Sequence, residues 1–85
     1  FKGKVLALHG AIDPYVSEAE LKQFETEMNQ YKVDYQLVKY ANAVHSFTNK
    51  AAGNDNSKGA AYNAAADMRS WIAFKSFLNE VAPIQ

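Results

Sequence analysis

The sequence contains no cysteine. This absence excludes disulfides, thiolate metal sites and a cysteine nucleophile within the 85 residues. Cysteine usage therefore gives no indication of the redox compartment. We expect a cytoplasmic protein and leave a periplasmic or secreted location open, because the N-terminal part of the protein is expected to be missing.

The sequence also lacks an excess of charge of either sign. Nine Lys and Arg residues balance nine Asp and Glu residues, and the basic residues are scattered singly along the chain. Proteins that bind nucleic acids or anionic membranes normally carry a basic excess. The apolar run at residues 5–8 is far too short to cross a bilayer. The sequence therefore predicts neither a nucleic-acid partner nor a membrane partner.

The composition is typical of a small globular domain. Apolar residues make up 48% of the chain and aromatic residues 13%, which are not the values of a disordered protein. A chain of 85 residues forms at most one domain, and it needs efficient packing or a partner surface because it buries a modest fraction of its unfolded surface. The chain opens at Phe1 and reaches a predicted strand within a few residues. We interpret residues 1–85 as a single partial domain cut from a larger one.

Hydrophobic patterning predicts two strands. Residues 5–8 read VLAL, and this continuous apolar run is typical of a strand covered on both faces in a parallel sheet, so we expect a strand over 4–9. Gly10 and Pro14 end this strand, since proline cannot donate to a sheet ladder. A second strand over 33–40 is rich in β-branched and aromatic residues, and its more mixed pattern places it nearer the edge of the sheet.

Two helices are predicted as well. Ser17 and Glu20 match a capping box that begins a helix over 17–31. Its apolar stripe comprises Leu21, Phe24, Met28 and Tyr31. The second helix, over 60–81, is rich in helix-forming residues. The side that we expect to be buried comprises Ala61, Ala64, Ala65, Met68, Trp71, Phe74 or Lys75, and Leu78. Residues 41–59 lack periodicity, and so long a loop in a compact domain is typically functional.

The predicted order β-α-β-α indicates an α/β fold. A single helix connects the two strands, so they should be parallel with a right-handed crossover. Two parallel strands and two helices cannot cover both faces of a sheet. We therefore expect the chain to form the edge of a larger parallel α/β sheet.

Two polar residues follow the predicted strands at their carboxyl ends. Asp13 lies just beyond the first strand and His45 just beyond the second. In open parallel sheets, catalytic groups and ligands gather at this edge, and adjacent strands would hold both loops within reach of each other. A carboxylate that accepts a hydrogen bond from a His ring nitrogen fixes the tautomer and stabilises the imidazolium. His45 would then act as a general base.

Simpler interpretations of these residues stay open. Asp13 precedes Pro14, and Asp-Pro is a common turn opener. His45 could be a loop residue without a role. His9, at the end of the first strand, is expected to satisfy local backbone groups. A zinc site built from His9, Asp13 and His45 is conceivable, because two His and one carboxylate can bind zinc, but no further ligand supports it. Phe47 either lines a substrate pocket or anchors its loop.

The same segments resemble the dienelactone hydrolase family. Residues 8–14 read LHGAIDP and residues 43–49 read AVHSFTN, similar to the LHG-x-x-D-P segment and the following Val-His-x-Phe segment of that family. The AAGND stretch at 51–55, with AAY and RSW near and in the last helix, resembles one branch. The resemblance implies the C-terminal portion of an α/β-hydrolase, with a Cys or Ser nucleophile, an Asp, a His and no cofactor. On this resemblance Asp13 is the acid and His45 the base, in the chain order that α/β-hydrolases use.

The third member of such a triad is not found in the sequence. The four glycines, at positions 3, 10, 53 and 59, bracket no Ser or Cys, so no nucleophile elbow is present. Ser17 is expected to cap a helix, Ser57 to lie in a turn, and Ser70 and Ser76 to lie on a helix surface. Ser46 adjoins the proposed base, where in-line proton transfer is rarely possible. We expect the nucleophile before the first residue, and an inactive isolated chain.

The expected substrate is a small-molecule ester or lactone. Family members that act on carboxylated dienelactones use arginines to hold the substrate carboxylate, one of them shortly after the catalytic His. Residues 46–53 contain no Arg, and Asn49 and Lys50 stand in that stretch. The resemblance therefore implies a general esterase or lactonase.

A second hypothesis assigns no catalysis to the chain. A βαβα unit without the rest of its sheet would expose a strand edge and apolar faces. Such surfaces favour pairing between copies. On this hypothesis the chain is a self-association or binding module that forms a homodimer through its exposed sheet edge.

Overall fold

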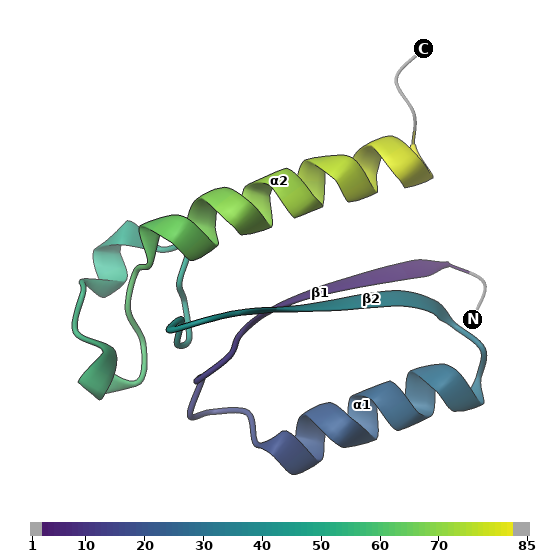
Figure 1. The fold of residues 1–85 in the computed structure, drawn as a ribbon, viewed down its shortest axis with the longest axis horizontal. Helices are drawn as coiled ribbons and strands as arrows, with labels where there is room; N and C mark the ends of the chain where they lie inside the picture. Colours follow the sequence, from purple (N-terminus) through teal and green to yellow (C-terminus); the bar gives the residue numbers. More distant parts are fainter. Residues whose placement is uncertain (1–2, 83–85) are drawn as a thin grey trace.

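The structure is a computed structural model that describes residues 3–82. The expected cut at Phe1 lies outside this range. The helices and strands follow the predicted order, and the fold class is α/β (Figure 1). The elements are β1 (Lys4–Gly10), α1 (Glu18–Gln30), β2 (Asp34–Tyr40), the short 3₁₀ turns η1 (Lys50–Ala52) and η2 (Asn56–Lys58), and α2 (Ala64–Val81).

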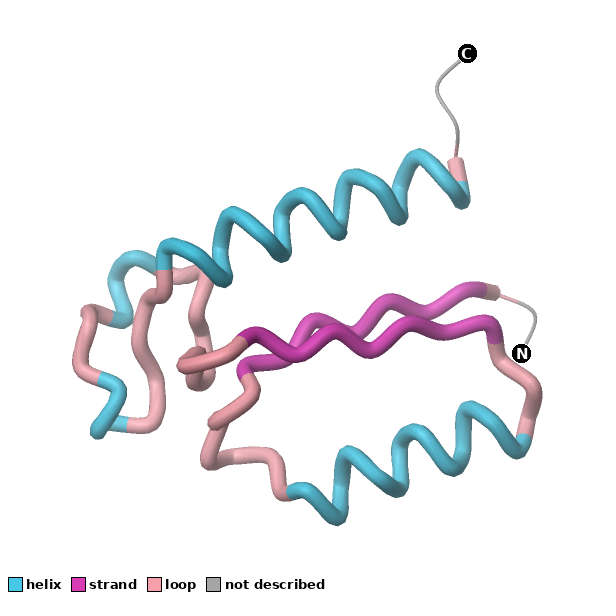
Figure 2. The backbone as a smooth tube through the Cα atoms, viewed as in Figure 1, coloured by secondary structure: helices cyan, strands magenta, loops and turns pink. Residues whose placement is uncertain are grey.

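The two strands form a parallel sheet, as predicted. Lys4 lies opposite Asp34 at one end of the ladder, and Gly10 lies opposite Tyr40 at the other. Both strands agree with the predicted ranges to within one residue. Because the strands are parallel and in register, the loops that follow them leave the sheet at the same edge (Figure 2).

Helix α1 agrees with the predicted range 17–31 to within one residue at each end. The Ser17 Oγ accepts a hydrogen bond from the backbone N–H of Glu20 at 3.1 Å, and the Glu20 carboxylate accepts one from the N–H of Ser17, so the capping box is present. Leu21, Phe24 and Met28 are half-buried. Tyr31, expected to extend this stripe, is instead the C-cap and is exposed. It lines a shallow groove with Val5, Met28 and Val33 but remains mostly in solvent.

Helix α2 begins at Ala64, so the predicted start at residue 60 was wrong. Asn63 is the N-cap, with an extended backbone and a side-chain oxygen that accepts the N–H of Ala66 at 3.0 Å. The N–H groups of Ala61 and Asn63 donate to the backbone of a distant loop instead of entering a helix. Tertiary hydrogen bonds thus override the helix propensity of the alanines here.

The predicted buried side of the second helix was also wrong, apart from Ala61, which is buried but precedes α2. The face turned toward the sheet carries Ala66 and Ser70, which are buried, and then Ala73 and Phe77, which are half-buried. Trp71 is 56% exposed and packs on Phe74 with ring centroids 5.6 Å apart. The remaining members of the predicted stripe that lie within the helix are exposed as well: Ala64, Ala65, Met68, Lys75 and Leu78. The helix is apolar on several sides, so more than one stripe fits the helical period.

The helices lie on opposite faces of the sheet, with α2 on one side and α1 on the other (Figure 1). The sequence predicts that two helices cannot cover both faces of the sheet. Residues 5–9 of β1 are accordingly only half-buried. The buried core gathers at the carboxyl end of the sheet, where α2 begins. It comprises Tyr40, Ala43, Phe47 and Ala66, with Leu8 and Val38 packed against it. Within residues 3–82, no helix is long and apolar enough to span a membrane.

Candidate active site

Gly10 joins the loop after β1 to the loop after β2. A Cβ atom at this position would lie 2.6 Å from the carbonyl oxygens of both Ala43 and Val44, which is closer than real contacts allow. The N–H of Ile12 donates to the carbonyl of Ala43 at 3.1 Å, and the N–H of Ala11 donates to that of the last β2 residue at 2.9 Å. Only glycine permits this approach, so the two loops lie backbone to backbone.

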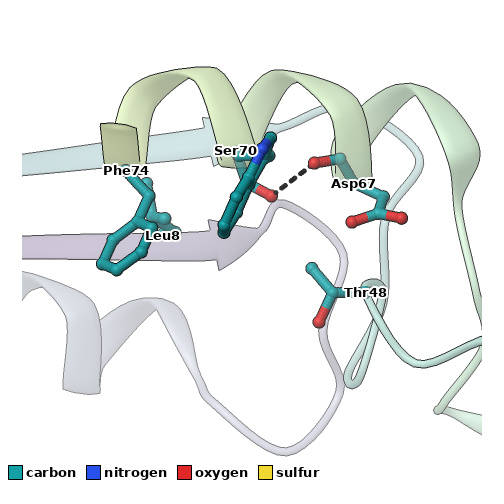
Figure 3. A pocket seen from close by; sticks show the side chains of 6 residues that line it. Leu8, Thr48, Asp67, Ser70 and Phe74 are labelled. Atoms are coloured by element: carbon teal, nitrogen blue, oxygen red, sulfur yellow. Dashed lines mark hydrogen bonds between the residues drawn. The ribbon is translucent and has the colours of Figure 1, made fainter. Parts of the chain in front are cut away.

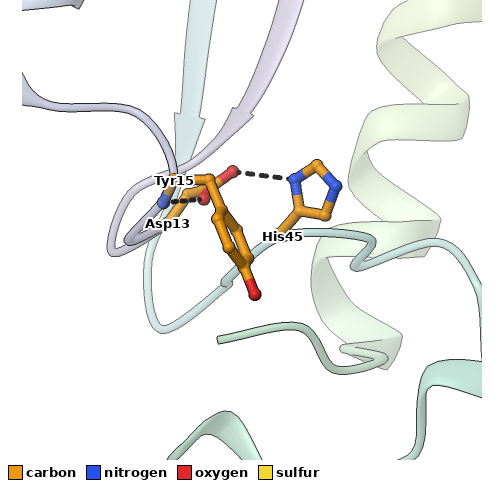
Figure 4. Close-up of polar contacts among 3 residues, drawn as sticks. All are labelled: Asp13, Tyr15 and His45. Atoms are coloured by element: carbon orange, nitrogen blue, oxygen red, sulfur yellow. Dashed lines mark hydrogen bonds and ion pairs between the residues drawn. The ribbon is translucent and has the colours of Figure 1, made fainter. Parts of the chain in front are cut away.

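Asp13 is held at this edge in a fixed orientation. Its backbone N–H donates to the carbonyl of Gly10 at 3.1 Å, and its Oδ1 accepts the N–H of Tyr15 at 2.8 Å, which forms an Asx turn. Its Oδ2 lies 3.3 Å from Nδ1 of His45 (Figure 4). The Asp13 side chain is only 7% exposed. Asp13 therefore has both of the roles that the sequence allowed: it forms a turn, and its carboxylate contacts His45.

His45 presents its ring to solvent while its backbone is fixed. Its N–H donates to the carbonyl of Gly59 at 3.2 Å, and its own carbonyl accepts the N–H of Ala61 at 3.0 Å. The ring is 55% exposed, and Nε2 points away from Asp13 (Figure 4). A carboxylate at Nδ1 favours the tautomer with its proton on Nδ1. Nε2 is then left as a free acceptor on the open side of the site.

An aromatic side chain completes the wall beside the imidazole. The Tyr15 ring meets that of His45 edge to face, with centroids 5.2 Å apart and an interplanar angle of 71°. Gly59, at φ +83°, runs close to the same ring, since a Cβ there would lie 3.3 Å from the Tyr15 hydroxyl. Tyr15 is otherwise exposed. It was not singled out from the sequence, although its place two residues after Asp13 at the sheet edge was a usable signal.

The profile of the dienelactone hydrolase family matches residues 1–82. The chain belongs to this family. A putative carboxymethylenebutenolidase of Saccharolobus solfataricus is 33% identical over 81 residues, which are 95% of this chain and 28% of that protein. An uncharacterised protein of Caenorhabditis elegans is 35% identical over 72 residues, which are 85% of this chain and 46% of that protein.

Two solved structures share the fold of this chain. A dienelactone hydrolase-like promiscuous phosphotriesterase from metagenomic libraries superposes with a TM-score of 0.85 at 42% identity, covering 92% of this chain and 33% of that one. A protein called m3DLH gives a TM-score of 0.86 at 39% identity, covering 94% and 33%. The chain thus spans less than half the length of these relatives, and it has the α/β-hydrolase fold of a hydrolase family.

His9 lies apart from the pair that Asp13 and His45 form. It belongs to β1 opposite Lys39, and it lines a groove on the α1 face together with Leu21 and Phe24. Among the residues that the structure describes, no three His, Cys, Asp or Glu side chains come close enough to hold a metal ion. The alternative of a zinc site from His9, Asp13 and His45 therefore does not match the structure.

The long loop after β2 is ordered by polar side chains that sequence reasoning missed. The carbonyl of Asn42, at φ +61°, accepts hydrogen bonds from the side chains of Asn56 at 3.0 Å and Asn63 at 3.3 Å. Asn49 caps η1 by accepting the N–H of Ala51. Phe47 is 8% exposed and packs on Tyr40, so of its two possible roles it serves as the anchor of the loop. Asparagines spaced through a loop were the only signal for this network.

Burial affects one further group beneath the site. The Tyr40 side chain lies in the core, and its hydroxyl finds no hydrogen-bond partner among the described residues. Burial raises the pKa of Tyr40 above its usual value, because the ionised form would lose its hydration. The phenol is therefore neutral at physiological pH, and its ring packs on Phe47 of the His45 loop.

Proposed function

We propose that this chain supplies the acid and the base of a hydrolase triad, with Asp13 orienting His45. The contact of 3.3 Å between the Asp13 Oδ2 and the His45 Nδ1 is the observation that carries the proposal. The buried carboxylate and the exposed ring fit the two roles, since the acid must hold the imidazole and the base must reach a reacting group.

In this mechanism the His45 Nε2 removes the proton from a Ser hydroxyl or Cys thiol as that nucleophile attacks the carbonyl carbon of the substrate. The imidazolium, stabilised by Asp13, then gives the proton to the leaving alkoxide, and an acyl-enzyme remains. In the second half, Nε2 takes a proton from water as the water attacks the acyl group. The same proton then returns to the nucleophile, so the base ends the cycle neutral.

The nucleophile of the proposed triad comes from outside the 85 residues. The glycines of this chain bracket no Ser or Cys. Ser17 is occupied as a helix cap, and the Ser70 hydroxyl is buried and donates to a helix carbonyl. Ser46 follows His45 directly, at φ +60°. The isolated chain is accordingly expected to be inactive, and the full-length protein active.

The proposed substrate is a small ester or lactone. No Arg lies between residues 46 and 53, and the Asn49 side chain is engaged in capping η1. This argues against a carboxylated dienelactone held by arginine in this loop. The names of two relatives, a putative carboxymethylenebutenolidase and a promiscuous phosphotriesterase, are consistent with ester-type substrates.

Two histidine variants of the full-length protein test the proposal. His45→Ala removes the proposed base. His9→Ala serves as its control, because His9 lies in the groove between the sheet and α1 and takes no part in the contact between Asp13 and His45. Turnover of p-nitrophenyl acetate and of a simple lactone should be lost in His45→Ala and kept in His9→Ala. Normal turnover in a folded His45→Ala protein would refute the proposed role.

A second candidate function is self-association of this chain with another copy. In the described part of the chain the sheet holds only β1 and β2, so each strand has one free edge. On the α2 face, Leu8, Trp71 and Phe74 line an open groove of about 330 Å³, together with Thr48, Asp67 and Ser70 (Figure 3). A second copy offers the same edge and the same aromatic pair, which suits a symmetric contact.

Light scattering after size exclusion, at several concentrations, tests this candidate. Self-association predicts a dimer that Trp71→Glu converts to a monomer, with Lys22→Glu on the outer surface of α1 as a control. A monomer at every concentration would contradict it.

A further inference from the structure

A backbone ladder holds the loop that carries His45. The His45 N–H donates to Gly59 at 3.2 Å, the Ala61 N–H donates to His45 at 3.0 Å, and the Asn63 N–H donates to Phe47 at 3.0 Å. These bonds form a short parallel pairing between residues 45–47 and 59–63. The position of His45 therefore depends on where the 59–63 segment lies.

The 59–63 segment leads directly into α2, and a side-chain contact joins this segment to the first turn of the helix. The Tyr62 hydroxyl donates to the Asp67 Oδ2 at 2.7 Å. Tyr62 immediately precedes the N-cap Asn63, and Asp67 is the fourth residue of the helix. Apolar residues at these two positions often form a hydrophobic staple that fixes how a chain enters a helix. Here a charge-assisted hydrogen bond joins the same positions.

Asp67, the helical partner in this contact, lies in a part of α2 that packs on the sheet. Ala66 and Ser70, on either side of Asp67 in the sequence, are buried in the α2 face, and the Ser70 hydroxyl donates to the Asp67 carbonyl at 3.0 Å (Figure 3). The acidic side chain also lies in the first turn of α2, where the helix dipole favours a negative charge. Asp67 is thus a stable anchor for the phenol.

We propose that Tyr62 is a positioning residue for His45, acting through its hydrogen bond to Asp67 and the backbone ladder of residues 59–63. The proposal rests on the proposed role of His45 as the general base. Without the bond, the entry into α2 loosens, the ladder loses its alignment, and the imidazole moves relative to Asp13. The hydrogen bond to Asp67 also raises the pKa of Tyr62, so the phenol keeps its proton and remains a donor at physiological pH.

Four variants of the full-length protein separate positioning from general stability. Tyr62→Phe removes only the hydroxyl, and Asp67→Ala removes its acceptor. Asp67→Asn keeps an acceptor oxygen and should rescue the contact. Tyr35→Phe is the matched control, because Tyr35 is also half-buried and packs on Phe24 at the α1 face, far from the ladder.

Three measurements are made on each folded variant: kcat and KM for p-nitrophenyl acetate, the NMR chemical shifts of the His45 ring, and amide hydrogen exchange at Ala61 and Asn63. In Tyr62→Phe we expect kcat to fall about ten- to a hundred-fold with KM little changed, since small displacements of a catalytic group have effects of this size. Exchange at both amides should accelerate, and the ring shifts should change. Asp67→Ala should show the same loss of kcat as Tyr62→Phe, and the double variant Tyr62→Phe/Asp67→Ala should lose no more than either single variant. Asp67→Asn should keep most of the activity.

The outcomes are distinct. If Tyr62→Phe behaves like Tyr35→Phe in all three measurements, the proposal is wrong. A loss of activity that follows only the folded fraction, with unchanged His45 shifts, also overturns it. If Tyr62→Phe does not fold, the comparison of Asp67→Asn with Asp67→Ala decides. If His45→Ala keeps its turnover, the proposed function fails, while ring shifts and exchange still decide whether Tyr62 positions His45.

Discussion

Asp13 and His45 are 32 positions apart in the sequence, and their side chains meet at 3.3 Å. The carboxylate is buried and the imidazole is exposed, so the pair has one fixed member and one accessible member. Each residue follows a parallel strand, and Gly10 lets the two loops touch. The backbone contact between the loops therefore holds the two side chains at the same edge of the sheet.

Gly10→Ala should separate the two loops. The added Cβ would meet two backbone carbonyl oxygens at 2.6 Å, and backbone atoms cannot rotate away as a side chain can. We expect a loss of about 1–3 kcal/mol in the free energy of unfolding, as for overpacking, with a large loss of turnover. Asn54→Ala is the control, because it lies at an exposed position of the loop. Urea unfolding and esterase assays compare them, and equal activity in both variants would contradict the prediction.

Asp13→Asn should impair catalysis while leaving the fold intact. The amide can still accept the Tyr15 N–H, but it cannot stabilise an imidazolium, and it can impose the wrong tautomer on His45. We expect kcat in the full-length protein to fall by roughly three to four orders of magnitude, the size known for such a change in triads. Asp55→Asn, in an exposed turn, should leave kcat unchanged. A loss below about tenfold would speak against a triad role for Asp13.

Tyr40→Phe should not destabilise the chain. The hydroxyl is buried without a partner among the described residues, so its removal relieves an unmet desolvation cost. We expect the free energy of unfolding to rise by about 1 kcal/mol or to stay level. Thermal unfolding measures this. A clear loss of stability would mean that the hydroxyl has a hydrogen-bond partner.

Ser17→Ala should weaken the start of α1. It removes the oxygen that accepts the N–H of Glu20, and half of the capping box is lost. A loss of about 1 kcal/mol is expected, as for other N-cap serines. Ser76→Ala, on an exposed surface of α2, should cost little. If denaturant unfolding gives the same loss for both variants, the cap contributes no stability.

The chain should lose stability at alkaline pH through two tyrosines. The pKa of Tyr62 is raised first by its hydrogen bond to Asp67, and the pKa of Tyr40 by burial. A folded-state pKa above the unfolded value gives stability that is complete below about pH 10 and lost as the pH rises through the raised values. Tyrosinate absorbance should show two late-ionising groups, and Tyr62→Phe and Tyr40→Phe should each remove one. Unchanged titrations would contradict the raised pKa values.

Much of the fold could be predicted because its signals are local. The apolar run of β1, the capping box at Ser17 and the β-forming residues of β2 each act within a few positions. The edge where Asp13 and His45 meet followed from the strand order alone, since parallel neighbours end at the same side. The start of α2 could not be predicted, because residues 60–63 pair with a loop some fifteen positions away, and this pairing outweighs the alanine propensity.

The sequence by itself determined the order of strands and helices, the cap of α1 and the two residues at the carboxyl edge. Those features depend on side-chain pattern and backbone chemistry within single segments. Only the tertiary structure decided which face of α2 is buried, that Trp71 is exposed, and that Tyr15, Asn63 and Tyr62 surround the His45 loop. The physical reason is that several packings of these segments have similar local energies. Contacts between segments that are distant in the sequence stabilise one of them.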